Sequence, residues 1–149
     1  MKKVLILFLI GLVGCSEQAD YRGKWFSFSD EGDYQELWIG EGKALSYLTK
    51  VDKLLLYQYT ISGDSLKFSL IESDFIDSHE FVLRIKSQEG EAMVTEFISD
   101  TRINPVKTYF LVEKEVPQLV DNLAGNLMFR EEIFAREAGG GQSHEGHGH

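Results

Sequence analysis

The sequence predicts an all-β fold of eight antiparallel strands in meander order, forming a sandwich or a barrel, with one C-terminal helix. Two observations lead to this prediction. From about residue 21 to residue 114, short runs rich in aromatic and branched side chains alternate with turns that contain Gly, Asp, Ser or Lys. After that region, apolar residues recur at helical spacing. Because the connections between runs are tight, consecutive strands are expected to pair as antiparallel neighbours.

The alternation of side chains indicates which strands face water on one side. The predicted strands are Lys24–Ser29, Tyr34–Ile39, Lys43–Thr49, Leu54–Ser62, Ser65–Ile71, Glu80–Lys86, Ala92–Ile98 and Lys107–Val112. In the fifth run, Leu66, Phe68 and Leu70 fall on one face and polar residues fall on the other, which is typical of a half-buried strand. The fourth run is apolar on both faces at its start, as expected where another element covers the sheet.

A helix is predicted to begin near Pro117, which fits the first turn of a helix. Its apolar residues recur near the helical period through about Glu137, and they are Val116, Leu119, Val120, Leu123, Leu127 and Phe134. Gly125 weakens the helix by about 1 kcal/mol relative to alanine, so a break there is an open alternative. The helix is expected to pack outside the sheet. A partner-binding or membrane-surface helix is the other interpretation, although its polar face is acidic and interfacial helices favour basic ones.

The N-terminus has the pattern of a secretory signal, with Lys2 and Lys3 ahead of an apolar run from Val4 to Val13. This run is too short to span a bilayer, which needs roughly 20 residues. The segment 12–15, Leu-Val-Gly-Cys, resembles the lipobox of bacterial lipoproteins. The resemblance implies a signal peptide over residues 1–14 and a mature chain that begins at lipidated Cys15. The alternative is a simple secretory signal with an incidental cysteine.

The charge balance excludes some partners. Lys2 and Lys3 would leave with the signal peptide, so 13 of the 15 basic residues would remain beside 24 acidic ones. That balance argues against nucleic acid and against electrostatic docking on anionic lipid. Membrane attachment would therefore rest on the acyl chains at Cys15, the only cysteine. Ser16 follows Cys15, and resemblance to the lipoprotein sorting rule then favours the outer membrane over the inner one.

The segment 15–20 is a short polar tether, and the domain is predicted over residues 21–137. Its first strand opens with Gly23-Lys24-Trp25, and residues 59–66 read Tyr-Thr-Ile-Ser-Gly-Asp-Ser-Leu. Both motifs resemble those of lipocalin-like bacterial lipoproteins. The resemblance implies an up-and-down barrel of eight strands, with Trp25 closing the narrow end, a helix packed outside, and Arg102 as the candidate to cap the tryptophan. Such a barrel is either filled by side chains or wide enough for one small ligand.

Catalytic motifs such as a nucleophile elbow or a zinc-protease helix are missing from the sequence, so no catalytic residue and no cofactor are predicted. His79 is the only histidine outside the C-terminal tail, and a solvated residue at a strand start is favoured over a catalytic base. Phe75 and Ile76 lie in a long loop, either as lid residues or as side chains that pin the loop to the rim. Glu36 and Gln58 are strand residues that could place polar groups in a pocket.

The tail, residues 138–149, is rich in glycine and histidine and is predicted to be disordered. His144, His147 and His149 could bind copper, nickel or zinc, because imidazole suits all three ions. A plain solubilising tail is the alternative. The sequence thus favours a noncatalytic envelope protein that binds a small apolar or amphipathic molecule or acts as an interaction module. Metal capture by the tail and an enzyme in the barrel remain as alternatives.

Overall fold

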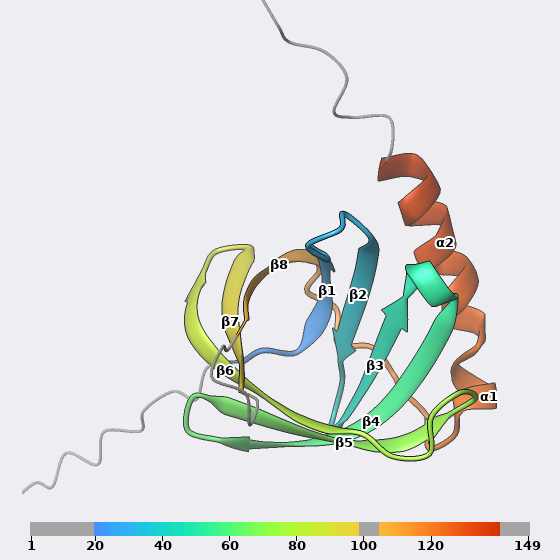
Figure 1. Cartoon of the computed structure of the whole chain (residues 1–149), viewed down its shortest axis with the longest axis horizontal. Coiled ribbons are helices and arrows are strands. Elements are labelled where there is room, and N and C mark those ends of the chain that lie inside the picture. The colour runs from blue at the N-terminus through green and yellow to red at the C-terminus, as the bar shows by residue number, and fades with distance from the viewer. Residues whose placement is uncertain (1–19, 99–104, 141–149) are drawn as a thin grey trace, which may run out of the picture.

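The computed structural model describes residues 20–98 and 105–140. Its eight strands form a closed antiparallel barrel in which each strand pairs with the next and β8 closes on β1 (Figure 1). The elements are β1 (Gly23–Phe28), β2 (Tyr34–Ile39), β3 (Lys43–Leu48), η1 (Thr49–Val51), β4 (Lys53–Ser62), β5 (Ser65–Ser73), β6 (Glu80–Glu89), β7 (Ala92–Ile98), β8 (Val106–Glu113), α1 (Leu123–Asn126) and α2 (Met128–Gly140). The predicted eight-stranded meander is confirmed, and it closes as a barrel.

Antiparallel order places the connections at two ends of the barrel. One end holds the start of β1, the end of β8 and the turns at 40–42, 63–64 and 90–91, and we name it the closed end. The other holds the connections 29–33, 49–52 and 74–79, and we name it the open end. Side chains that alternate inward along the strands line the interior, and one core cluster contains residues from all eight strands.

Trp25 is buried at the closed end, where its Nε1 donates to the Tyr21 carbonyl oxygen at 2.9 Å. Gly23, two residues earlier, has a φ of +139°. A Cβ at Gly23 would lie 2.9 Å from the Glu113 carbonyl oxygen, so a side chain there meets both backbone strain and a steric clash. The Gly-x-Trp motif therefore has a physical basis here: the glycine lets β1 and β8 approach, and the tryptophan fills the space between them.

The helix begins later than the sequence predicts. Residues 114–122 are not helical, and the two helices α1 and α2 follow with a break at Leu127, two residues beyond Gly125. The Pro117 backbone crosses the turn after β2 so closely that a Cβ at Gly40 would lie 2.6 Å from the Pro117 carbonyl oxygen. Contact with the barrel thus keeps this segment out of the helical conformation.

Side chains then set where α1 starts. The Asn122 side chain accepts a hydrogen bond from the Gly125 amide at 2.7 Å and caps the helix. Asn126, fully buried, accepts from the Val120 amide at 3.1 Å and donates to the Val120 carbonyl at 3.0 Å. These bonds satisfy the backbone without a helical turn.

The helical segment packs outside the barrel, as predicted (Figure 1). Outward residues of three strands form a second core with Leu123 and Ile133, namely Trp38, Leu45, Tyr47, Leu54 and Leu56. The predicted apolar stripe is wrong in part, because Val120, Leu127 and Phe134 are about half exposed whereas Ile133 is buried. The break at Leu127 changes the helical phase. None of the described helices is long and apolar enough to cross a membrane.

Candidate ligand site in the barrel

Aromatic side chains cover one side of the barrel interior, and we name Tyr57, Tyr59, Phe68, Phe81 and Phe97 the aromatic wall. They come from β4, β5, β6 and β7. Phe68 and Phe81 pair directly across β5 and β6, and their rings stack at 4.6 Å with planes 9° apart. Phe81 and Phe97 stack at 5.6 Å with planes 15° apart. The strands thus place nearly parallel rings side by side, the geometry of favourable cross-strand aromatic pairs.

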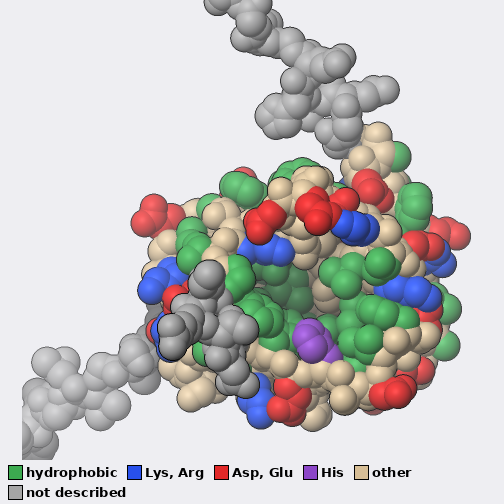
Figure 2. All heavy atoms as spheres, viewed as in Figure 1, with side chains coloured by type: hydrophobic (Ala, Val, Ile, Leu, Met, Phe, Trp, Pro, Cys, Tyr) green, Lys and Arg blue, Asp and Glu red, His purple; other side chains and the backbone are tan. Residues whose placement is uncertain are grey.

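The aromatic wall reaches the open end, and the molecule is hollowed in the view of Figure 2. Hydrophobic side chains line the hollow, and a histidine lies inside its rim. His79 is exposed and directly precedes β6, as predicted. Its Nδ1 lies 3.0 Å from the Tyr57 hydroxyl, and its ring lies 5.3 Å from the Phe81 ring. His79 therefore continues the aromatic wall outward and supplies a polar edge there.

Tyr57 is almost fully buried, and burial raises the pKa of its phenol, which therefore stays protonated at neutral pH. Its hydroxyl bonds His79 as donor or acceptor according to the imidazole tautomer. The tyrosine and histidine together provide one polar pair in otherwise apolar surroundings. A few placed polar groups on apolar walls are typical of small-molecule sites.

Polar side chains cover the other side of the interior, and we name Ser27, Thr95, Lys107 and Tyr109 the polar wall. They come from β1, β7 and β8, and Thr95 pairs with Lys107 across the two last strands. The Thr95 hydroxyl donates to the Lys107 carbonyl oxygen at 3.3 Å. Ser27 is fully buried, and its hydroxyl makes no hydrogen bond of ordinary geometry with the part of the chain that the structure describes. Burial raises the pKa of Tyr109 to about 12.

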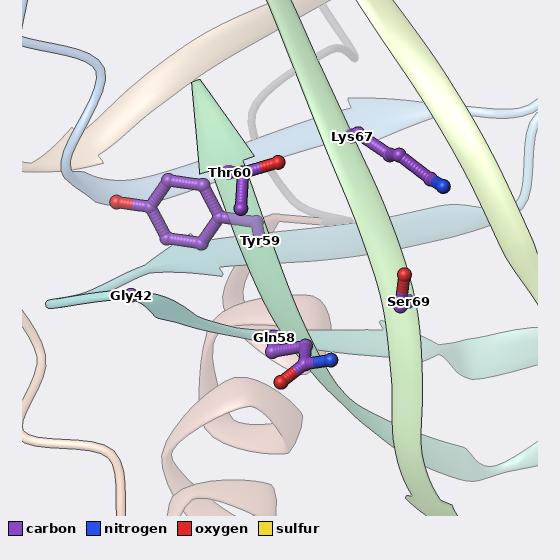
Figure 3. A pocket seen from close by; sticks show the side chains of 6 residues that line it. All are labelled: Gly42, Gln58, Tyr59, Thr60, Lys67 and Ser69. Carbon is purple, nitrogen blue, oxygen red and sulfur yellow. The ribbon is translucent and has the colours of Figure 1, made fainter. Parts of the chain in front are cut away.

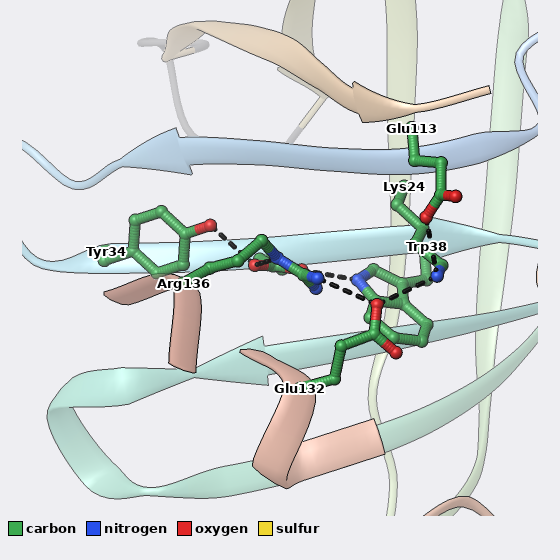
Figure 4. Close-up of polar contacts among 7 residues, drawn as sticks. Lys24, Tyr34, Trp38, Glu113, Glu132 and Arg136 are labelled. Carbon is green, nitrogen blue, oxygen red and sulfur yellow. Dashed lines mark hydrogen bonds and ion pairs between the residues drawn. The ribbon is translucent and has the colours of Figure 1, made fainter. Parts of the chain in front are cut away.

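A second polar cluster lies outside the barrel, between β2 and α2 (Figure 4). The Glu36 carboxylate is fully buried and accepts two hydrogen bonds from Arg136, at 2.8 and 2.7 Å. It also accepts from the Tyr34 hydroxyl and from Trp38 Nε1, each at 2.5 Å. Every acceptor position of this carboxylate is thus occupied by protein donors. Glu36 fixes the helix, and it does not face the barrel interior as a pocket residue would.

Lys24 and Glu132 extend this cluster. Lys24 Nζ donates to Glu132 at 2.9 Å and to Glu113 at 3.0 Å, and it lies 4.6 Å from the Trp38 ring centroid. Partial burial would raise the pKa of Glu132, but hydrogen bonds from Arg136 and Lys24 outweigh it and lower that pKa. The cluster joins two cations to three carboxylates, so α2 is held to β1, β2 and β8 by charge-assisted bonds.

Figure 3 shows a separate polar groove of about 230 Å³ near β4 and β5. Its lining residues are Gly42, Gln58, Tyr59, Thr60, Lys67 and Ser69. Gln58 and Thr60 point outward and are exposed, so Gln58 is not a polar group of the interior. Tyr59 points away from them, and its hydroxyl donates to the Gly40 carbonyl oxygen at 2.8 Å. This groove is open and polar, and it carries no feature that would hold an apolar ligand.

The outer face of β1, β2 and β8 carries four aromatic rings, Phe26, Phe28, Tyr34 and Phe110, which we name the outer aromatic patch. Phe26 lies at its centre, 5.7 Å from Tyr34, 5.9 Å from Phe28 and 5.5 Å from Phe110. Phe28 is 53% exposed and Phe110 is 44% exposed. Clustered aromatic surface of this kind marks an interaction site more often than scattered apolar residues do.

The loop between β5 and β6 agrees in part with the second prediction made for it, in which its two apolar residues pin it to the rim. Ile76 packs against the interior core cluster, so it pins the loop to the barrel. Phe75 is exposed and lies near Lys53, whose Nζ is 6.0 Å from its ring centroid. The loop is thus held at the rim by one of its two apolar residues, and the other faces solvent.

Several predicted residues lie outside the described residues. They are Cys15, Arg102, His144, His147 and His149. Within residues 20–98 and 105–140, no three His, Cys, Asp or Glu side chains gather closely enough to hold a metal ion. No family model, curated protein or solved structure matches the chain. The class of protein is therefore defined by its geometry, a closed barrel of eight antiparallel strands with a hollowed, aromatic-lined interior and a helix clamped outside.

Proposed function

We propose that this protein is a lipid-anchored, lipocalin-like binding protein of the bacterial envelope that holds a small apolar or amphipathic molecule inside its barrel without catalysis. The aromatic wall at the hollowed open end is the observation that carries the proposal. An eight-stranded barrel is either filled by side chains or holds one small ligand, and the hollow at the open end favours a ligand. Stacked rings and a single tyrosine–histidine pair offer such a ligand apolar contact and one polar partner.

The anchor is part of the same proposal, and it rests on the lipobox that ends at Cys15 and on the signal-like segment before it. Ser16 supports sorting to the outer membrane. Residues 16–20 join Cys15 to Tyr21, a link of roughly 20 Å when fully extended. Such a short tether would keep the barrel beside the bilayer, where a carrier would meet apolar molecules.

Fluorescence titration of the full-length protein with phenylnaphthylamine, an uncharged apolar dye, tests the binding function. We expect one saturable site. Replacing Phe81 by serine should weaken binding at least tenfold, because the ring stacks on two neighbours in the aromatic wall. Phe110→Ser on the outer face is the matched control and should leave the affinity within twofold. Absence of a saturable site, or equal effects of the two variants, would contradict the proposal.

The outer aromatic patch favours a second function, contact with the lipid headgroup region of the anchoring membrane. Trp and Tyr are enriched where protein meets the membrane–water interface, and Phe is common on the buried face of interfacial helices. The patch includes two residues of β1, the strand that follows the proposed tether directly, so it would lie within reach of the bilayer. The protein would then rest on its side, with Phe28 and Phe110 against the headgroups.

This contact can be measured with a tryptophan reporter in the lipidated protein. Phe28→Trp, reconstituted in vesicles whose acyl chains carry bromine, should be quenched well beyond the background of the two native tryptophans. Thr60→Trp is the matched control, because Thr60 is exposed on a different strand outside the barrel. Equal quenching of the two reporters would show that the outer aromatic patch does not face the bilayer.

A further inference from the structure

Lys107 is the one charged side chain at an inward position of the described strands β1, β7 and β8, whereas Lys53, at the inward start of β4, is ion-paired with Asp74. Lys107, Tyr109 and Leu111 lie two residues apart on β8 and so share its inner face. The last two residues belong to the interior core cluster or pack against it. It is half-buried, and no ion pair joins it to a carboxylate within residues 20–98 and 105–140. A protein with formal charge −9 offers many carboxylates elsewhere. An ammonium placed inside a largely apolar barrel therefore calls for a functional explanation.

Ser27 adds a second, independent observation. The register Phe26↔Phe110 between β1 and β8 places Ser27 beside Tyr109, one inward step deeper than Lys107. Ser27 is fully buried, yet among residues 20–98 and 105–140 its hydroxyl makes no hydrogen bond of ordinary geometry, although the Tyr109 phenol lies beside it. Buried hydroxyls are normally bonded, and an unsatisfied one lowers stability. The polar wall thus holds an ammonium, a phenol and a buried hydroxyl on neighbouring strands.

The two sides of the interior also differ in chemistry. In the aromatic wall, Phe68, Phe81 and Phe97 have nearly parallel rings, which suit a flat apolar body, and the Tyr57 ring stands perpendicular to Phe68 and Phe81. The polar wall on β7, β8 and β1 presents hydrogen-bond donors and one positive charge. Lys107 lies toward the open end, because β8 begins there. An amphipathic molecule could contact both sides at once, with its charged group near the mouth.

We propose that the ligand of this barrel carries one anionic group, a carboxylate or a related oxyanion, which Lys107 binds while Ser27 and Tyr109 offer hydroxyls beside it, and that its flat apolar body lies on the aromatic wall. This inference rests on the proposed binding function and adds the chemical class of the ligand. A lysine supplies three donors and a full charge, and its bonds to oxyanions are charge-assisted. Burial lowers the pKa of Lys107 despite the opposing effect of Asp30, and a bound anion would counteract that shift by favouring the charged amine.

Two dyes of one shape separate the charge from the apolar body. Anilinonaphthalene sulfonate is an anion, and phenylnaphthylamine is its uncharged parent. Titrating both into the full-length protein, we expect Lys107→Met to weaken binding of the sulfonate about tenfold or more and to leave the affinity for the uncharged dye within twofold. Lys107→Arg should retain most of the sulfonate affinity. Lys67→Met is the control, because Lys67 lines the separate polar groove near β4 and β5, and it should change neither affinity.

The outcomes distinguish the two levels of the proposal. If both dyes bind and Lys107→Met leaves the sulfonate affinity unchanged, the anionic ligand class is overturned while the binding function stands. If Lys107→Met weakened the binding of both dyes equally, the anionic ligand class would also be overturned, because the effect would not depend on the charge of the ligand. If the native protein binds neither dye, the binding function itself fails.

Discussion

Replacing Arg136 by methionine is expected to lower the free energy of unfolding by about 3–5 kcal/mol, because it leaves the buried Glu36 carboxylate without its cation. Two of the four hydrogen bonds to that carboxylate disappear, and those from Tyr34 and Trp38 cannot neutralise its charge. Urea unfolding followed by tryptophan fluorescence measures the change, since Trp38 contacts the same cluster.

Arg130→Met is the matched control on the same helix. Arg130 pairs with Asp52 on the surface, where both side chains are well exposed, so its loss should cost no more than about 1 kcal/mol. A difference between the two variants of less than about 0.5 kcal/mol, the spread expected of surface substitutions, would mean that the Glu36 cluster does not hold α2 to the barrel.

Phe68→Ala has the second large expected effect, a loss of about 3–5 kcal/mol in the free energy of unfolding. Phe68 is fully buried at the centre of the aromatic wall and contacts Tyr57, Tyr59 and Phe81. Its removal takes away a large apolar side chain and leaves a cavity against those rings. Thermal unfolding by circular dichroism, together with the midpoint in urea, measures the loss.

Phe75→Ala provides the comparison, because Phe75 is an exposed aromatic residue of the loop between β5 and β6. Its effect should stay within about 0.5 kcal/mol, as is usual for surface substitutions. Should Phe68→Ala destabilise the protein no more than Phe75→Ala does, the ring would not be part of a packed wall, and the description of the interior would be wrong.

The strands were predictable because alternation and turn residues are local signals. The bounds of Tyr34–Ile39 and Ala92–Ile98 agree with the sequence prediction, and the other strands differ by three residues or fewer at either end. The apolar double face at the start of β4 also correctly indicated an element packed outside, since Leu54 and Leu56 contact the helical segment. The alternation of apolar and polar residues was therefore enough to predict the strands and their order.

The start of the helix and the Glu36–Arg136 ion pair that holds the helix to the barrel were not predictable in the same way. Helical spacing predicts a helix from Pro117, whereas contact with the Gly40 turn keeps that segment out of the helical conformation. Glu36 and Arg136 lie 100 residues apart in the chain, so nothing local signals their pairing. Both features depend on tertiary contacts, which override a periodic pattern.

The interior polar residues were predictable only in part. Alternation along β8 could have placed Lys107 inward with Tyr109, because the strand itself was predicted. The buried hydroxyl of Ser27 had no such signal, since a serine in a strand is ordinarily a solvent-facing residue. The sequence instead suggested Glu36 and Gln58 as polar residues of a pocket, and the structure places both outside the interior.

The central claim is that the barrel binds a small molecule, and native mass spectrometry of the full-length protein, purified without added dye, tests it most directly. We expect a copurified organic mass of one molecule per chain that is lost when the protein is denatured, and that carries an acidic group. An apo mass with no adduct, from a protein that also takes up no apolar dye, would contradict the claim and leave membrane contact through the outer aromatic patch as the better-supported role.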